Sequence, residues 1–127
     1  MAELTLILAP ERFAVCKLPP TASVPPLPLN ASLVSVTLTK DELSLVVPEY
    51  AAPEDARIEE GWRALRVAGT LDFSLTGILA SLATPLAKAG VSIFAVSTFD
   101  TDYLLIPEAG LEQALIVLRA AGHTIEG

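Results

Sequence analysis

The order of strand-like and helix-like segments in the second half of the chain constrains the fold more than any other feature. Residues 62–69 alternate apolar and basic side chains, as a half-exposed strand does, whereas residues 78–89 carry apolar side chains at helical spacing. In chain order, the expected elements are a strand at 62–69, a helix at 78–89, strands at 91–97 and 102–107, a helix at 111–119 and a short strand at 123–126. This βαββαβ order predicts two helices on one face of a four-stranded antiparallel sheet, the ferredoxin-like arrangement of the α+β class.

Residues that commonly end helices support both predicted helices. Gly90 and Gly122 stand where each apolar repeat stops, the position at which a left-handed glycine often closes a helix. Pro85 falls inside the first helix and removes one backbone donor, so a kink or a displaced turn is expected there. The strand at 91–97 has apolar residues on both alternating sets, which predicts that both faces of the sheet are covered, by the first half of the chain or by a second chain.

The first half of the chain is interpreted as short strands around a proline-rich connection. Apolar runs at 4–9 and 12–17 flank a short turn and predict a hairpin, and the runs at 33–39 and 43–47 predict a second pair of strands. Five prolines between Leu18 and Leu29 remove five backbone donors and exclude a regular helix or a central strand there. A signalling ligand for an SH3-type domain is the alternative interpretation of this proline-rich stretch.

Composition and charge exclude several classes of function. Fifteen acidic residues against eight basic ones give a formal net charge of −7, and such a surface repels nucleic acid and anionic membranes. The single cysteine, Cys16, excludes an intramolecular disulfide, and its apolar neighbours predict a buried position. No apolar run approaches the roughly 20 residues that span a bilayer, and no signal-peptide pattern is present. A cytoplasmic protein with no nucleic-acid and no membrane partner is therefore expected.

The βαββαβ order, with Gly77 before the first helix, resembles the ACT domain. The stretch from Ala87 to Pro107 is more specific: its turn Ser97-Thr98-Phe99-Asp100-Thr101-Asp102 is similar to that of the tandem ACT-like proteins of the CASTOR arginine-sensor type. The resemblance implies two ferredoxin-like, ACT-type units with antiparallel sheets and helices on one face. We expect the first unit, at 1–57, to be degenerate because its prolines prevent a full helix, and the ACT domain to occupy 58–127. The acidic, turn-rich stretch 48–61 then forms the boundary.

The resemblance also implies a ligand site between ACT units and no chemical reaction. In sensors of this type, an amino acid contacts the strand-start serine and its neighbour, the loop before the first helix, and the turn that ends in aspartate. By position, these contacts fall on Ser92 and Ile93, on Asp72, Phe73, Leu75, Gly77 and Ile78, and on Thr98, Phe99, Thr101 and Asp102. This chain supplies about two units where the sensor combines four, and Leu75 stands where an arginine binder would place a polar residue. Both departures put arginine itself in doubt as the ligand.

The chemistry of these residues suits an amino acid, which offers a carboxylate and an ammonium group. The loop before Gly77 leads into a helix N-terminus, whose free N–H groups favour an anion, although a side chain of the loop could simply cap the helix. Asp102 begins an otherwise apolar strand, where a carboxylate prefers a cationic partner. A ligand ammonium would serve, and so would Arg63 or Arg66; a turn-forming role for Asp102 is a further alternative.

No constellation typical of an enzyme is visible. His123 is the only histidine, and neither a nucleophile elbow nor a phosphate-cradling glycine motif occurs. A magnesium or calcium site at Asp100, Asp102 and Glu108 is the metal alternative. We expect a homodimeric, allosteric regulatory protein that needs no cofactor, binds a small-molecule amino acid and acts on a protein target that the sequence does not identify. The alternative is an interaction module that dimerises through ACT sheets without a ligand.

Overall fold

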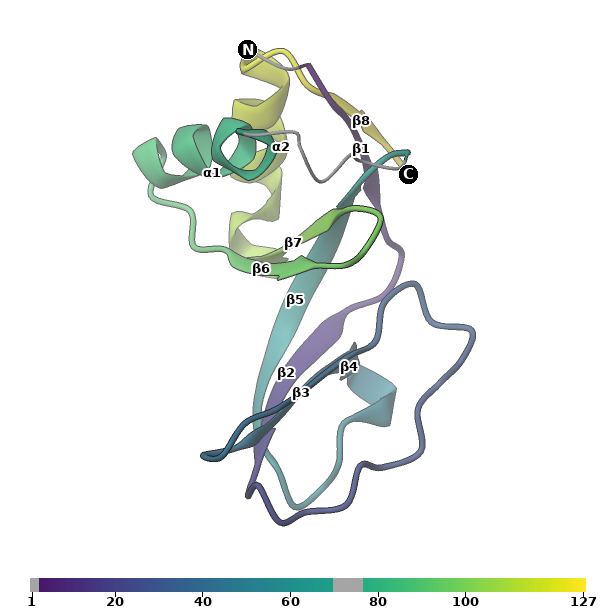
Figure 1. Cartoon of the computed structure of the whole chain (residues 1–127). Coiled ribbons are helices and arrows are strands. Elements are labelled where there is room, and N and C mark those ends of the chain that lie inside the picture. The colour runs from purple at the N-terminus through teal and green to yellow at the C-terminus, as the bar shows by residue number, and fades with distance from the viewer. Residues whose placement is uncertain (1–2, 70–76) are drawn as a thin grey trace. The chain divides into compact units, whose positions relative to one another are not determined.

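The computed structural model describes residues 3–69 and 77–127, and by internal contacts the chain divides into two compact units. One unit joins residues 1–10 to residues 63–127, and the other consists of residues 11–62. The long strand β5 (Arg57–Val67) contributes its first part to the second of these and its last part to the first. Figure 1 shows the elements of both units, which are described separately below.

The unit of residues 1–10 and 63–127 contains the predicted βαββαβ order. After β5 come α1 (Ile78–Lys88), β6 (Phe94–Ser97), β7 (Asp102–Pro107), the 3-10 turn η2 (Glu108–Gly110), α2 (Leu111–Ala120) and β8 (Thr124–Glu126). The prediction of element order is confirmed here because periodicity and glycine positions are local signals that each segment carries by itself.

The sheet of this unit is mixed, which corrects the expectation of a purely antiparallel one. Its strand order is β6-β7-β5-β1-β8, with β1 (Thr5–Leu8) between β5 and β8. β1 runs antiparallel to β5, with Leu6 opposite Val67, and parallel to β8, with Leu6 opposite Ile125. The first strand of the chain therefore completes a sheet whose other members lie far along the sequence.

Both helices cover one face of this sheet, as predicted, and Figure 1 shows them on the same side of it. The core beneath them consists of buried apolar residues from the strands and from the inner faces of both helices: Leu6, Leu65, Val67, Leu82, Leu86, Val91, Leu104, Ile106, Ala114 and Leu118. On the opposite face, Leu105, between Leu104 and Ile106 on β7, is also fully buried. Ala95 on β6 pairs with Leu104 and therefore lies on the helix-bearing face, but it is exposed. The prediction that β6 is buried is therefore wrong for Ala95.

Each helix ends in the glycine-closed turn that the sequence predicted. At the end of α1, Val91 N–H donates to the Leu86 carbonyl at 2.9 Å and Gly90 N–H to the Ala87 carbonyl at 3.0 Å, and Gly90 has a φ of +75°. At the end of α2, His123 N–H donates to Leu118 at 3.1 Å, with Gly122 at φ +101°. This pair of bonds satisfies carbonyls that the helix leaves free, and only glycine adopts the required φ without strain.

Pro85 lies inside α1, and a histidine compensates for its missing N–H group. In a regular helix the N–H of residue 85 would donate to the carbonyl of Ser81. Here the Ser81 carbonyl is instead contacted by Nε2 of His123 at 3.2 Å. Nδ1 of the same ring accepts the Leu4 N–H at 3.1 Å, so Nε2 carries the proton and donates it to Ser81. The buried imidazole thus links the start of β1, the middle of α1 and the end of α2.

The unit of residues 11–62 is an antiparallel sheet in the order β3-β4-β2-β5. Its strands are β2 (Phe13–Leu18), β3 (Ser35–Leu38), β4 (Leu43–Pro48) and the first part of β5, with a 3-10 turn, η1 (Glu49–Ala51), and no α-helix among residues 11–62. The β3–β4 hairpin was predicted and is confirmed, with Leu38 opposite Leu43. The predicted hairpin of 4–9 with 12–17 is wrong, because β1 pairs with β5 and β8 while β2 pairs with β4 and β5.

Two further features of this unit concern its loops. Residues 23–28 of the proline-rich stretch form neither helix, strand nor turn, as expected. After this stretch, the Glu11 carboxylate accepts hydrogen bonds from Ser32, at 2.7 Å from its N–H and at 2.6 Å from its hydroxyl. The predicted boundary at 48–61 contains part of β5, which begins at Arg57 and bulges at Gly61, where φ is +81°. By contact, residues 1–10 group with the second half, whereas the division into sequence-related units at 1–57 and 58–127 stays a prediction.

Candidate functional site

The hairpin between β6 and β7 positions one group of the predicted ligand contacts. Across its turn, Thr98 N–H donates to the Thr101 carbonyl at 2.8 Å, and Thr101 N–H donates to the Thr98 hydroxyl at 3.2 Å. The Thr101 hydroxyl is buried and donates to the Val67 carbonyl at 2.7 Å. Thr101 therefore holds the turn against the end of β5, and its hydroxyl is committed to the protein.

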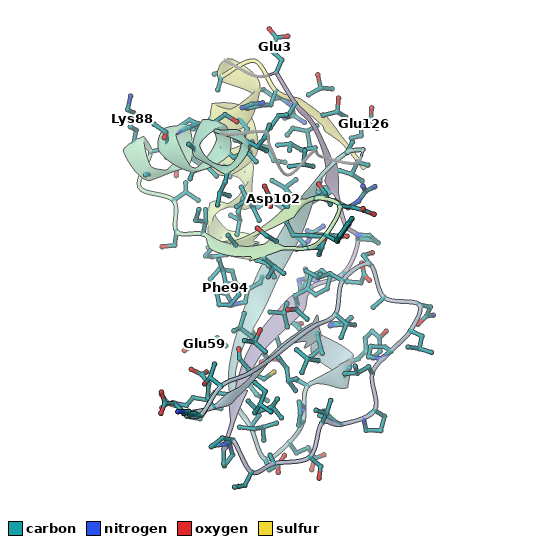
Figure 2. All side chains as sticks on the ribbon, viewed as in Figure 1. Glu3, Glu59, Lys88, Phe94, Asp102 and Glu126 are labelled. Carbon is teal, nitrogen blue, oxygen red and sulfur yellow. The ribbon has the colours of Figure 1, made fainter. Side chains whose placement is uncertain are left out.

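Asp102 lies on the face of the sheet that carries the helices. Side chains alternate along β7, so Asp102 shares a face with Leu104 and Ile106, which belong to the core under α1 and α2. Its Oδ1 accepts a 2.7 Å hydrogen bond from the hydroxyl of Ser97, the residue opposite it on β6. Figure 2 labels Asp102 on the β6–β7 hairpin. Among the described residues, Oδ2 has no hydrogen-bond partner, and Asp102 forms no ion pair with Arg63 or Arg66.

The strand-start pair lies at the other end of β6. Ser92 is exposed, and the half-buried Ile93 packs against the core beneath the helices. The four residues of β6 separate this pair from the turn, a distance of about 13 Å at about 3.3 Å per residue. The outer side of β6 pairs with no strand of the described residues, because β6 ends the strand order of its unit.

Gly77 is the N-cap residue that precedes α1. It has a left-handed φ of +78° and no side chain, so it gives the first turn of α1 no side-chain cap. Ile78 is half-buried, and its side chain packs against the core. Three predicted contacts, Asp72, Phe73 and Leu75, lie outside the described residues.

The structure thus brings Thr98, Thr101 and Asp102 to one place beside the end of β5. Phe99 lies at the tip of the turn with 79% of its surface exposed. The structure does not bring Ser92 and Ile93 to the same point within one chain. Sequence reasoning missed Ser97, the partner of Asp102. The signal was available, since residues 97 and 102 flank a four-residue turn and must face each other in a hairpin.

Neither a metal centre nor a membrane segment is found in the part of the chain that the structure describes. No three histidine, cysteine, aspartate or glutamate side chains of residues 3–69 and 77–127 gather closely enough to hold a metal ion, so the proposed Asp100, Asp102 and Glu108 set does not form one. None of the helices described has the length and apolar character needed to cross a bilayer.

Comparison with known proteins identifies the family. The family model of the ACT domain matches residues 57–120, and a second family model, for an N-terminal domain, matches residues 11–55. The mixed sheet with two helices on one face over residues 63–127 agrees with the first match. The chain therefore belongs to the ACT domain family.

Two relatives above 30% identity place it more closely. The human cytosolic arginine sensor for mTORC1 subunit 1 is 33% identical over 106 residues, which cover 77% of this chain and 32% of the sensor, so the chain spans about a third of that protein. A crystal structure of an Agobacterium tumefaciens protein is 34% identical, with a TM-score of 0.91, and the match covers 98% of this chain and 93% of that one.

A more distant structure extends the fold comparison. The regulatory subunit of aspartate kinase from Thermus flavus is 12% identical with a TM-score of 0.65, over 94% of this chain and 99% of that one. At this identity the likeness concerns the fold alone, and it confirms an ACT-type arrangement. Of these three proteins, one is named as a cytosolic arginine sensor and one as a regulatory subunit of aspartate kinase.

Proposed function

We propose that this protein is a cytoplasmic amino-acid sensor that binds its ligand without catalysing a reaction. The observation that carries the proposal is the β6–β7 hairpin, where Asp102 offers a carboxylate oxygen on the helix-bearing face with Ser97 orienting the other oxygen. A carboxylate in this setting suits an ammonium or guanidinium group, because a hydrogen bond between ionised groups is shorter and stronger than one between neutral groups. The relationship to a protein named as a cytosolic arginine sensor supports the same ligand class.

The proposed site includes the backbone at the start of α1 and the start of β6. Helix N–H groups after Gly77 would bind the ligand carboxylate, and Asp72, Phe73 and Leu75 would line the approach to them. Ser92 and Ile93 would present polar backbone groups from a second ACT-type unit, because within one chain they lie at the far end of β6 from Asp102. The site is therefore proposed to lie between units, in a homodimer whose first unit, residues 1–57, is a degenerate ACT unit.

A panel of the twenty amino acids in a thermal-shift assay tests the proposal. A ligand at about 100 times its dissociation constant adds about 2.7 kcal/mol to the free energy of unfolding, which corresponds to a rise in Tm of roughly 5–15 °C. One amino acid, or a few related ones, should stabilise the protein to this extent. If none of the twenty shifts the Tm at millimolar concentration, the alternative of an interaction module without a ligand replaces this proposal.

Two matched variants locate the site once the panel has identified an amino acid. Asp102→Asn keeps size and turn geometry but removes the charge, and a charge-assisted hydrogen bond is worth about 1.5–3 kcal/mol, so affinity should fall by about tenfold to a hundredfold. Asp100→Asn, on the exposed side of the same turn, is the control and should bind as the parent does. Calorimetry that finds equal affinity for the parent and Asp102→Asn would remove Asp102 from the site and leave it a structural partner of Ser97.

A further inference from the structure

The longest uncharged stretch of this acidic chain runs from Leu18 to Thr39 and ends in the edge strand β3. Several large apolar side chains that the fold leaves exposed lie within it, namely Val24, Leu29, Val36 and Leu38. Exposed apolar side chains lower solubility and commonly mark a binding surface. The amino-acid site proposed at the β6–β7 hairpin does not use these residues. β3 in particular combines exposed apolar side chains with an open strand edge.

The hydrogen-bond pattern of the β3–β4 hairpin determines which backbone groups of β3 are open. Thr39 N–H donates to the Glu42 carbonyl at 2.9 Å, and in an antiparallel pair such bonded positions recur at every second residue. Thr37, opposite Ser44, therefore directs its N–H and carbonyl toward β4. Val36 and Leu38 direct theirs toward the other edge, where no strand of residues 3–69 or 77–127 pairs, because β3 ends the strand order of its unit.

The side chains of Val36 and Leu38 continue a buried layer that stops at this edge. They lie opposite Leu45 and Leu43, which are 0% and 1% exposed in the core of the 11–62 unit. Val36 is 40% exposed and Leu38 65% exposed. The layer is thus closed on the β4 side and open on the outer side of β3, and a further strand with alternating apolar residues would extend it.

We propose that a second copy of this chain pairs here, β3 against β3, antiparallel about a twofold axis at Thr37. In this register Val36 of each copy lies opposite Leu38 of the other, and both residues have outward backbone groups, so the copies exchange N–H···O=C bonds at both pairs. Both apolar side chains meet on the same face, and Thr37 faces its own copy at the axis. β3 is therefore self-complementary in hydrogen bonding and in side-chain pattern.

Charge also favours a second copy at this edge. Two chains of net charge −7 repel each other, and contact is least costly where neither presents carboxylates. In the proposed register no charged residue of one copy faces a like charge of the other between Val34 and Lys40, because Lys40 lies opposite the uncharged Val34. The proposal rests on the homodimer proposed above and names the strand that forms it.

A charged substitution at the edge, with a control elsewhere, tests the interface. Leu38→Lys removes an apolar contact on both sides of the axis and should raise the dimer dissociation constant by roughly a hundredfold, as measured by light scattering and sedimentation. Ile116→Lys, at a 60% exposed position on α2, should leave it unchanged. A parent protein that is monomeric at micromolar concentration overturns the homodimer, whereas a dimer that Leu38→Lys leaves intact overturns β3 as its interface. The amino-acid panel is a separate measurement: a monomeric parent overturns a site between two copies, whereas a stabilising amino acid in the panel still shows that the chain binds a ligand.

A crosslink tests the register directly and does not depend on weakening the dimer. Thr37→Cys in a Cys16→Ser background places two thiols across the axis at a directly opposed pair, close enough for a disulfide. Mild oxidation should convert it to a covalent dimer, whereas Thr39→Cys, whose two copies lie about 13 Å apart along the strands, should stay monomeric on a denaturing gel. Equal crosslinking of the two variants, or none by Thr37→Cys, would refute the register.

Discussion

Replacing His123 by alanine should lower the free energy of unfolding by about 3 kcal/mol. The imidazole is 4% exposed, and it accepts the Leu4 N–H at 3.1 Å and donates to the Ser81 carbonyl at 3.2 Å. Its removal leaves two backbone groups without partners, at roughly 1 kcal/mol for the part-buried Leu4 N–H and somewhat more for the buried carbonyl. Lost packing of the ring accounts for about a further 1 kcal/mol.

Pro85 provides an internal test of this reasoning. The Ser81 carbonyl needs the histidine because residue 85 has no N–H to donate. Pro85→Ala supplies that N–H within the helix, so the cost of His123→Ala should be smaller by about 1–2 kcal/mol in the Pro85→Ala background. The two substitutions form a double-mutant cycle, and the coupling free energy between them measures how much hydrogen bonding of the Ser81 carbonyl contributes to stability.

Urea unfolding followed by circular dichroism measures all four proteins of the cycle. Thr124→Ala, exposed and next to His123 in the chain, is the control and should change stability by less than about 0.5 kcal/mol. The reasoning is refuted if His123→Ala costs the same with and without Pro85, because the carbonyl would then not be what the histidine satisfies.

Three further predictions follow from single contacts. Thr101→Val removes the hydroxyl that donates to Val67 and should cost about 1 kcal/mol in urea unfolding, with no loss if water replaces the bond. Burial raises the pKa of Glu11, but hydrogen bonds from Ser32 outweigh burial and lower the pKa below 4.5. The stabilisation that the ionised Glu11 gives the folded state is therefore present above pH 4.5 and lost as the pH falls below that value. Glu11→Gln should flatten the dependence of the free energy of unfolding on pH in that range. Burial, and then the charge of Glu60, raises the pKa of the Cys16 thiol above 9.0, so a thiol reagent should label native protein far more slowly than protein in urea; equal rates would contradict the buried position.

Much of the fold could be predicted because its signals are local. The spacing of Leu82 and Leu86 and the closing glycines predicted α1 and α2 with nearly the observed bounds. The first part of β5 was missed, because Arg57 to Gly61 is polar and contains a glycine, which is typical of a turn. Those side chains are largely exposed in the structure, and a strand with exposed faces carries no alternating apolar pattern to detect.

The candidate site was predictable in its turn but not in its chemistry. The position of Asp102 beside a hairpin turn could be inferred from the chain, and the structure places it there. That Thr101 gives its hydroxyl to Val67 could not be inferred, because the bond joins residues 34 apart in sequence, and no spacing rule connects them. The three loop positions Asp72, Phe73 and Leu75 remain predictions from resemblance.

The sequence by itself determined the order of the elements from residue 78 onward and the ends of both helices, since helix periodicity and the left-handed preference of Gly90 and Gly122 act within a few residues. The strand predicted at 91–97 begins only at Phe94. Only the tertiary structure decided the partners. Strands β1 and β2 follow one another in the chain but do not pair with each other. His123, which follows α2, donates to the Ser81 carbonyl of α1, which Pro85 leaves without a helical donor. The physical reason is that backbone donors and acceptors are chemically alike at every residue. Which ones meet is therefore decided by the arrangement that buries the most apolar surface across the whole chain.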